Sequence, residues 1–170
     1  VLNNRAVQGL YSPGSVFKLV TALAGLEAGL ISPRSTFYDL GYYTLPAEHN
    51  CTGRCTFFNS DRAALGAVDL SAALTRSSDA YFYRIGNELY WLEDQNQWAI
   101  QDMARSLGFG RQSGVELPFE AAGRIPDAEI KKRLLESNPA AYNPYNETLK
   151  WLPGDNINTA IGQGLVAVTP

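Results

Sequence analysis

A serine and a lysine, Ser15 and Lys18, stand three residues apart where a helix is predicted to begin. Residues i and i+3 share one helix face, so the hydroxyl and the amine can meet. Backbone N–H groups at a helix N-terminus favour a nearby anion, which helps a serine nucleophile or an oxyanion. A lysine among apolar neighbours such as Phe17 and Leu19 loses hydration and can act as a base. The pair therefore indicates a serine nucleophile activated by a lysine.

The short pattern alone is weak, because Ser-x-x-Lys often arises by chance. Its setting is more informative: Pro13-Gly14 breaks the chain before Ser15, and Lys18 is the only charged residue of the segment before Glu27. A lone lysine on an apolar helix usually extends its amine to solvent. This motif alone does not decide whether Lys18 is a catalytic base or a solvent-exposed lysine.

A second polar cluster, Ser77-Ser78-Asp79, precedes another predicted helix. Serine and aspartate are common N-cap residues, and capping accounts for Ser78 and Asp79 without any catalytic role. The functional alternative is a hydroxyl that relays protons together with a carboxylate that holds a lysine.

Helices are predicted to position these residues. The apolar residues from Ser15 to Leu30 recur at helical spacing, and Gly29 is a natural C-terminal stop, which predicts a buried helix. Residues 35–60 mix aromatic and chain-breaking residues, which indicates short strands or a long ordered loop. A short strand is expected at 115–117. Capping residues and apolar periodicity predict further helices over residues 69–74, 78–93, 96–107, 127–136 and, capped by Asp155, up to 162.

Composition excludes several classes of function. The 170 residues carry a net charge of −3, with 45% hydrophobic and 18% charged residues, as in one globular domain. The longest basic run is residues 131–133, so neither nucleic acid nor an anionic membrane patch is an expected partner. The longest apolar stretches are too short to span a membrane. A single histidine and the lack of Gly-x-Ser-x-Gly argue against a Ser–His–Asp hydrolase.

Four short segments of the chain can be compared with a family as a set. They are residues 11–18 (YSPGSVFK), 76–83 (RSSDAYFY), 154–156 (GDN), and 161–164 (IGQG) with 168–170 (VTP). Together and in this order they resemble the transpeptidase domain of penicillin-binding proteins, and the resemblance covers nearly the whole chain. Residues 39–46 (DLGYYTLP) and the aspartate of the second motif are most similar to class B and, within it, to the elongation-type penicillin-binding protein 2.

The resemblance implies an α+β fold of the penicillin-binding/β-lactamase-like type in the parent protein. Residues 1–170 would be a partial transpeptidase domain, mainly its helical part with few short strands. Ser15 would be the acylated nucleophile, Lys18 its base and Ser77 a proton relay. Asp79 would hold Lys18 and, with Ser15 and Ser77, contact the substrate. The implied reaction is D,D-transpeptidation: the D-Ala-D-Ala end of a peptidoglycan stem peptide acylates Ser15, and an amine of a neighbouring stem peptide displaces it.

Two departures from the family pattern matter. No Lys-Thr-Gly or Lys-Ser-Gly occurs in the chain, although the family uses that motif for the second oxyanion donor and for carboxylate binding. The isolated chain is therefore expected to be weak or inactive. Asp79 also stands where asparagine is usual, and a carboxylate beside Lys18 favours the ammonium form and opposes its use as a base. Either proton transfer runs through Ser77, or Asp79 and Lys18 share a proton.

A third cluster comprises His49, Cys51 and Cys55, with Asp39 upstream. A disulfide between Cys51 and Cys55 is the preferred interpretation, because the implied extracytoplasmic compartment permits one. Zinc bound by all four residues is possible, since some penicillin-binding protein 2 relatives carry an Asp/His/Cys zinc site, and free thiols are the remaining possibility. No cofactor is required by the implied reaction.

The resemblance also implies partners and a location. Stem peptides, β-lactam antibiotics and membrane proteins of the elongation complex would bind the parent. The parent would act at the extracytoplasmic face of a bacterial cell membrane, anchored by an N-terminal helix outside this sequence. Two alternatives remain: a serine β-lactamase or D,D-carboxypeptidase with the same nucleophile, and a non-catalytic β-lactam-sensing or scaffolding module.

Overall fold

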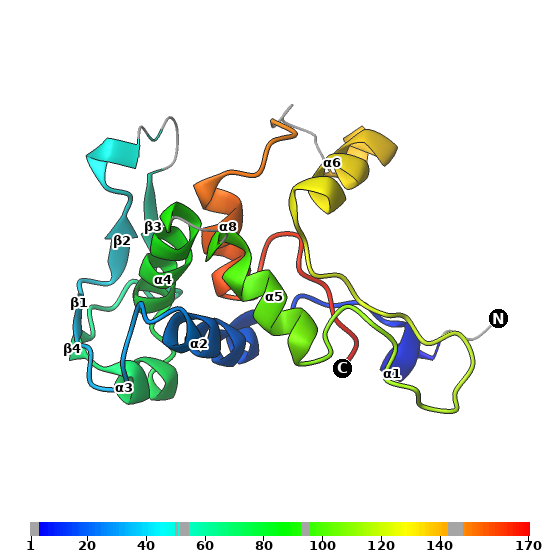
Figure 1. Cartoon of the computed structure of the whole chain (residues 1–170), viewed down its shortest axis with the longest axis horizontal. Helices are drawn as coiled ribbons and strands as arrows, with labels where there is room; N and C mark the ends of the chain where they lie inside the picture. The colour runs from blue at the N-terminus through cyan, green and yellow to red at the C-terminus, as the bar shows by residue number, and fades with distance from the viewer. Residues whose placement is uncertain (1–3, 50, 52–54, 93–95, 143–147) are drawn as a thin grey trace.

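The computed structural model describes residues 4–49, 51, 55–92, 96–142 and 148–170 (Figure 1). Helices dominate, as predicted. The α-helices are α1 (Arg5–Gln8), α2 (Lys18–Glu27), α3 (Leu70–Thr75), α4 (Asp79–Trp91), α5 (Ala99–Ser106), α6 (Ala128–Ser137), α7 (Pro139–Tyr142) and α8 (Pro153–Ala160), and the 3-10 helices are η1 (Gly14–Phe17), η2 (Ala47–His49) and η3 (Asn96–Trp98).

Short antiparallel pairs lie beside α4, in the region expected to hold strands or an ordered loop. Strand β1 (Phe37–Asp39) pairs with β4 (Gly66–Val68), and β2 (Tyr42–Thr44) pairs with β3 (Thr56–Phe58). Each pair is a separate two-stranded sheet. Two-stranded sheets are marginal alone, so packing against α4 must stabilise them; Phe57 of β3 meets Tyr83 of α4 with ring centroids 5.4 Å apart.

The core lies between α2, α4, α5 and α8. Helices α4 and α8 approach closely because Gly86 has no side chain: a Cβ there would lie 2.8 Å from the Ala160 Cβ. Asn156 of α8 donates to the Gly86 carbonyl at 2.8 Å, and Thr21 of α2 donates to the Ala160 carbonyl at 2.7 Å. These buried hydrogen bonds fix the mutual placement of the three helices.

The helix predicted over 15–30 is present, but its first turn is the 3-10 helix η1 and α2 ends at Glu27, two residues before Gly29. The sequence predicts a buried helix, but the structure buries only part of it. Val16, Leu19 and Leu23 lie on one face and are 73%, 56% and 43% exposed. Periodicity detects an apolar face, but it does not reveal what covers that face.

Other predicted elements agree in type. Asp69 caps α3 and Ser78 caps α4, each through its side-chain oxygen. The strand expected at 115–117 is wrong, since those residues pair with no strand within the described part of the chain, and Val115 and Leu117 are exposed. Asp155 is not the N-cap of α8; it lies in the first turn and accepts from the Leu152 N–H at 2.7 Å.

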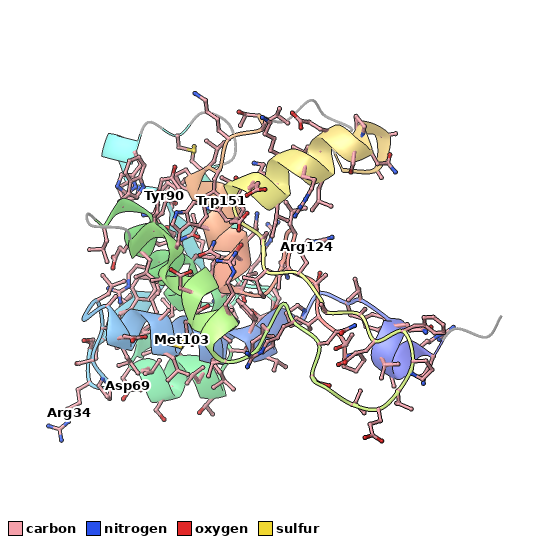
Figure 2. The ribbon with its side chains drawn as sticks, turned by 45° about the vertical axis from the view of Figure 1, so that its right-hand side comes forward. Arg34, Asp69, Tyr90, Met103, Arg124 and Trp151 are labelled. Carbon is pink, nitrogen blue, oxygen red and sulfur yellow. A yellow bond between two sulfur atoms is a disulfide. The ribbon has the colours of Figure 1, made fainter. Side chains whose placement is uncertain are left out.

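Two segments, α1 and the long loop after α5, form an extended arm. Figure 1 shows α1 and the long loop after α5 running together away from the helical core. Ala121 donates its N–H to the Val7 carbonyl, and Arg124 and Ala167 form an isolated antiparallel bridge. Away from this arm, Figure 2 shows Tyr90 and Trp151 close together, and the Tyr90 hydroxyl donates to the Trp151 carbonyl at 3.2 Å. None of the described helices has the length and apolar character needed to cross a membrane.

Candidate active site

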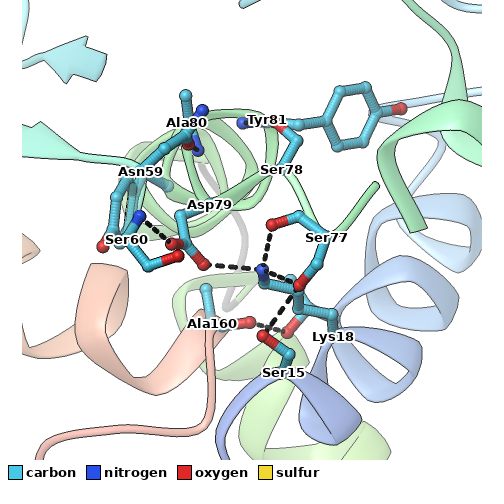
Figure 3. A network of polar contacts seen from close by, with 12 residues as sticks. Ser15, Lys18, Asn59, Ser60, Ser77, Ser78, Asp79, Ala80, Tyr81 and Ala160 are labelled. Carbon is cyan, nitrogen blue, oxygen red and sulfur yellow. Dashed lines mark hydrogen bonds and ion pairs between the residues drawn. The ribbon is translucent and has the colours of Figure 1, made fainter. Parts of the chain in front are cut away.

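Four polar side chains meet where η1 passes into α2, beside the N-terminus of α4 (Figure 3). The Ser77 hydroxyl lies 2.8 Å from the Ser15 hydroxyl and accepts a hydrogen bond from Lys18 Nζ at 2.9 Å. Lys18 Nζ also lies 2.6 Å from Asp79 Oδ1. The structure therefore brings together Ser15, Lys18, Ser77 and Asp79, the four residues that the sequence singled out.

Lys18 is 1% exposed, so it does not extend to solvent as a lone helical lysine usually would. It donates to the Ser77 carbonyl at 2.8 Å as well as to the Ser77 hydroxyl and Asp79. An ammonium has three N–H donors, and these three acceptors use all of them. Lys18 thus reaches Ser15 through Ser77, and the arrangement suits a proton relay by Ser77 better than direct proton removal by Lys18.

Ser77 occupies an uncommon backbone conformation in the turn between α3 and α4. Its φ is +54°, in the left-handed region that non-glycine residues seldom adopt. Such strain persists only where neighbouring contacts enforce it, and it is frequent at active sites. Ser78, the next residue, accepts from the Tyr81 N–H as the N-cap of α4. Capping therefore accounts for Ser78, whereas Ser77 and Asp79 face Lys18.

Two further residues belong to this site and were missed from the sequence. Ser60 donates its backbone N–H to Asp79 Oδ2 at 3.1 Å, and Asn59 accepts at 2.8 Å from the N–H of Ala80, the second residue of α4. Asn59-Ser60 lies in a segment predicted only as strands or ordered loop, and no local pattern marks it.

The C-terminal segment contacts the turn that precedes Ser15. Gly14 donates its N–H to the Gly162 carbonyl at 3.0 Å. Gly162 has a φ of +68°, and a Cβ there would lie 2.7 Å from the Phe17 Cβ. Glycine is therefore required at position 162 both by conformation and by space.

The four residues considered for zinc do not form a metal site. Cys51 and Cys55 are joined by a disulfide, so neither sulfur is a thiolate ligand. Asp39 is buried and accepts from other side chains, and His49 stacks on Trp91 with ring centroids 4.5 Å apart. No group of three or more potential metal ligands occurs among the described residues. The residues present fit a disulfide and do not fit zinc.

Groups with shifted pKa values lie on α4 behind the site. Burial raises the pKa of the Tyr81 phenol, and the Arg84 guanidinium only partly offsets this. Burial also raises the pKa of the Glu88 carboxyl, again against the effect of Arg84. Neither group touches Ser15, so their shifts bear on stability rather than on the chemistry.

Ser15, Ser77 and the buried Lys18 form a hydrogen-bonded row on this helical scaffold, the arrangement that the resemblance to penicillin-binding proteins implies. The chain belongs to that family: the family model described as the penicillin binding protein transpeptidase domain matches residues 1–170.

Among curated proteins, peptidoglycan D,D-transpeptidase MrdA of Acinetobacter baumannii is 35% identical over 169 residues, which is 99% of this chain and 22% of that protein. The chain thus spans about a fifth of this curated relative. The solved structure of Pseudomonas aeruginosa PBP2 in complex with WCK 5153 is 34% identical with a TM-score of 0.78, covering 99% of this chain and 33% of that one. The solved structure of Helicobacter pylori PBP2 in complex with MreC is 31% identical with a TM-score of 0.76, and the match covers 99% of this chain and 27% of that one.

Proposed function

We propose that this chain is part of a peptidoglycan D,D-transpeptidase that forms an acyl-enzyme at Ser15. The single observation that carries this proposal is the hydrogen-bonded row from Ser15 through Ser77 to Lys18, with Asp79 paired to the lysine. The family membership and the name of the Acinetobacter relative support it.

In the proposed first step, Ser15 Oγ attacks the carbonyl carbon of the penultimate D-alanine of a stem peptide. An oxygen–carbon bond forms, and the carbon–nitrogen bond to the terminal D-alanine breaks. Ser77 takes the proton of Ser15 and passes its own to the leaving amine, while the Lys18 ammonium stabilises the charge that builds on Ser77. The backbone N–H of Ser15 lies in the first helical turn and supplies one oxyanion donor.

In the proposed second step, an amine of a neighbouring stem peptide attacks the acyl carbon. The carbon–nitrogen bond forms as the bond to Ser15 breaks, and the proton of the amine returns through Ser77 to Ser15. A β-lactam acylates the same serine, but its opened ring stays attached, so the second step stalls. Asp79 would keep Lys18 in place and contact the substrate backbone throughout.

We propose further that residues 1–170 are the helical part of a larger transpeptidase domain. The exposed apolar face formed by Val16 of η1 with Leu19 and Leu23 of α2 supports this, because an apolar helix face is normally packed against another element. The Lys-Thr/Ser-Gly strand would belong to the remainder of the domain. The isolated chain is then expected to turn over poorly, since it lacks the second oxyanion donor.

We propose an extracytoplasmic location at the bacterial cell membrane, with an anchoring helix in the parent protein. The Cys51–Cys55 disulfide supports the location, because such bonds persist in oxidising compartments. The Helicobacter pylori relative is solved in complex with MreC, which supports a similar elongation-complex partner for the parent of this chain.

The deciding experiment is intact-mass measurement after benzylpenicillin treatment, on the full-length protein that contains this chain and on its Ser15→Ala variant. We expect one stable adduct per wild-type molecule and none on the variant. Rapid loss of the adduct by hydrolysis would indicate a β-lactamase instead. A folded wild-type protein without any adduct would overturn the proposal and favour a non-catalytic module.

A further inference from the structure

Asp39 is a fully buried carboxylate behind the second motif. Its Oδ1 accepts from the Gly41 N–H at 2.6 Å, and its Oδ2 accepts from the Ser78 hydroxyl at 2.5 Å. The Asn59 amide nitrogen lies 3.0 Å from both oxygens. Within the described ranges, no lysine, arginine or histidine pairs with this carboxylate. A buried carboxylate is costly unless donors surround it, so this cluster must be well ordered.

Asn59 ties the loop after β3 to the start of α4. Its amide nitrogen also donates to the Ala63 carbonyl at 3.0 Å, and its amide oxygen accepts from the Ala80 N–H at 2.8 Å. Its backbone N–H donates to the Gly41 carbonyl at 2.9 Å. Asn59 is 5% exposed, so loss of these partners would leave buried polar groups unpaired.

The cluster acts on the residues that flank Ser78. The Ser78 hydroxyl is bonded to Asp39, whereas Ser77 and Asp79 on either side are bonded to Lys18, as Figure 3 shows for the latter pair. Ser60, next to Asn59, holds the second oxygen of Asp79 through its backbone N–H. The loop that carries Asn59 and Ser60 therefore holds the carboxylate that faces the lysine, and it fixes the start of α4 through the Ala80 N–H and through Asp39.

We propose that Asp39 and Asn59 are positioning residues for acylation of Ser15. They hold residues 77–79 through the Ser78 hydroxyl and the Ala80 N–H. Ser77 thereby keeps its left-handed conformation, and its hydroxyl stays within hydrogen-bond distance of Ser15. Without them the turn relaxes toward negative φ, which is the favoured region for serine, and the relay moves away from the nucleophile. A misplacement of about 1 Å can cost on the order of 100-fold in rate. This inference rests on the proposed function.

The test separates binding from chemistry in the full-length protein. Benzylpenicillin acylation is followed at several antibiotic concentrations, which gives a non-covalent dissociation constant and an acylation rate constant for each variant. We expect Asn59→Leu and Ser78→Ala to lower the acylation rate constant by about 10- to 100-fold, with the dissociation constant changed by less than about threefold. Ser78→Thr keeps the hydroxyl and recovers most of the rate.

The matched control is Thr44→Val. It removes the 3.0 Å hydrogen bond between Thr44 of β2 and Thr56 of β3 and leaves Asp39, Asn59 and Ser78 unchanged. Its acylation rate constant should match wild type. Thermal unfolding of every variant shows which are folded at the assay temperature, and if Asn59→Leu does not fold, Ser78→Ala against Ser78→Thr decides the question.

Wild-type rates in folded Asn59→Leu or Ser78→Ala would overturn the positioning role, as would a loss confined to the dissociation constant. The proposed function is tested separately in the same assay. If wild type is acylated at Ser15 but the variants behave like wild type, only the positioning role fails. If wild type is never acylated, both proposals fail.

Discussion

The described residues include two lysine–aspartate ion pairs, each with a buried lysine, that are nearly alike in distance and exposure. Lys18 and Asp79 are 2.6 Å apart with side-chain exposures of 1% and 12%, and Lys131 and Asp155 are 2.7 Å apart with exposures of 3% and 19%. Each pair joins different elements: the first joins α2 to α4, and the second joins α6 to α8.

Their surroundings differ. Lys18 donates to two Ser77 oxygens besides Asp79, and through Ser77 it reaches the hydroxyl of Ser15. Asp155 is the hydrogen-bond partner of Lys131 within the described residues, and Asp155 also accepts from the N–H of Leu152, the N-cap of α8. A buried ion pair alone therefore does not make an active site. The proposed chemistry requires hydroxyl groups aligned beside the lysine, and among the described residues the first of these two pairs has them and the second does not.

The largest difference should appear when each lysine is removed. Lys18→Met takes away the charge beside the proposed proton relay, and we expect benzylpenicillin acylation of Ser15 to slow by about 1,000-fold. Lys131→Met should leave acylation of the folded protein within about threefold of wild type. Quench-flow kinetics with intact-mass detection measures both, and equal losses in the two variants would show that the pairs are functionally equivalent.

The second pair should matter for stability instead. Lys131→Met leaves the Asp155 carboxylate partly buried without its partner, and we expect the free energy of unfolding to fall by about 3 kcal/mol. The double variant Lys131→Met/Asp155→Asn removes the uncompensated charge while keeping an acceptor for the Leu152 N–H. Urea unfolding should show that the double variant regains much of the loss, and a double variant as unstable as the single one would contradict this account.

Two glycines allow a further comparison: Gly162 lies near the Lys18–Asp79 pair, and Gly154 lies beside Asp155 of the second pair. Gly162→Ala forces a side chain against Phe17 at a φ of +68°, and we expect it to destabilise the protein by about 2 kcal/mol and to slow acylation. Gly154, beside Asp155 in the first turn of α8, has no heavy atom within 4 Å of the place of a Cβ. Gly154→Ala should be near neutral in thermal unfolding and in acylation, so a similar loss there would count against steric control at Gly162.

The smallest effect concerns a third ion pair, in which Arg84 and Glu88 of α4 are 3.7 Å apart and partly exposed. Burial raises the pKa of Glu88 in the folded state, so ionised Glu88 opposes folding. The protein is free of this destabilisation in acid, where Glu88 is protonated in both the folded and the unfolded state. It loses stability as the pH rises through the pKa that Glu88 has in the folded state. Glu88→Gln should therefore raise the melting temperature slightly at pH 7 but not at pH 4. A variant less stable at pH 7 would show that the pair with Arg84 outweighs burial.

Local features of the chain could be predicted from sequence. Asp69 and Ser78 were expected as helix caps because capping depends on residues within one turn. The Ser15–Lys18 and Ser77–Asp79 motifs are likewise contained in short segments. Their meeting was implied only by a family resemblance, because contacts between distant segments depend on how helices pack.

Other features could not be predicted. Asn59 and Ser60 contact α4 only because the two-stranded sheets bring the chain back to the N-terminus of that helix. The sequence around Asn59 and Ser60 has no pattern that predicts this contact. The burial of Lys18 and the exposure of Leu19 on one helix depend on which face α4 and α8 cover. The 115–117 segment has strand-forming residues but pairs with no strand among the described residues.

The relay between Ser15 and Ser77 joins positions 62 residues apart, and the Thr21–Ala160 hydrogen bond beside it joins positions 139 apart. Closing such long loops costs entropy that local helix contacts do not. During synthesis the helices can form early, but the Thr21–Ala160 hydrogen bond, which joins α2 to α8 beside Ser15, forms only after α8 has been made. Covalent labelling by a penicillin would therefore report completed folding, and a nascent or truncated chain ending before α8 would not be labelled.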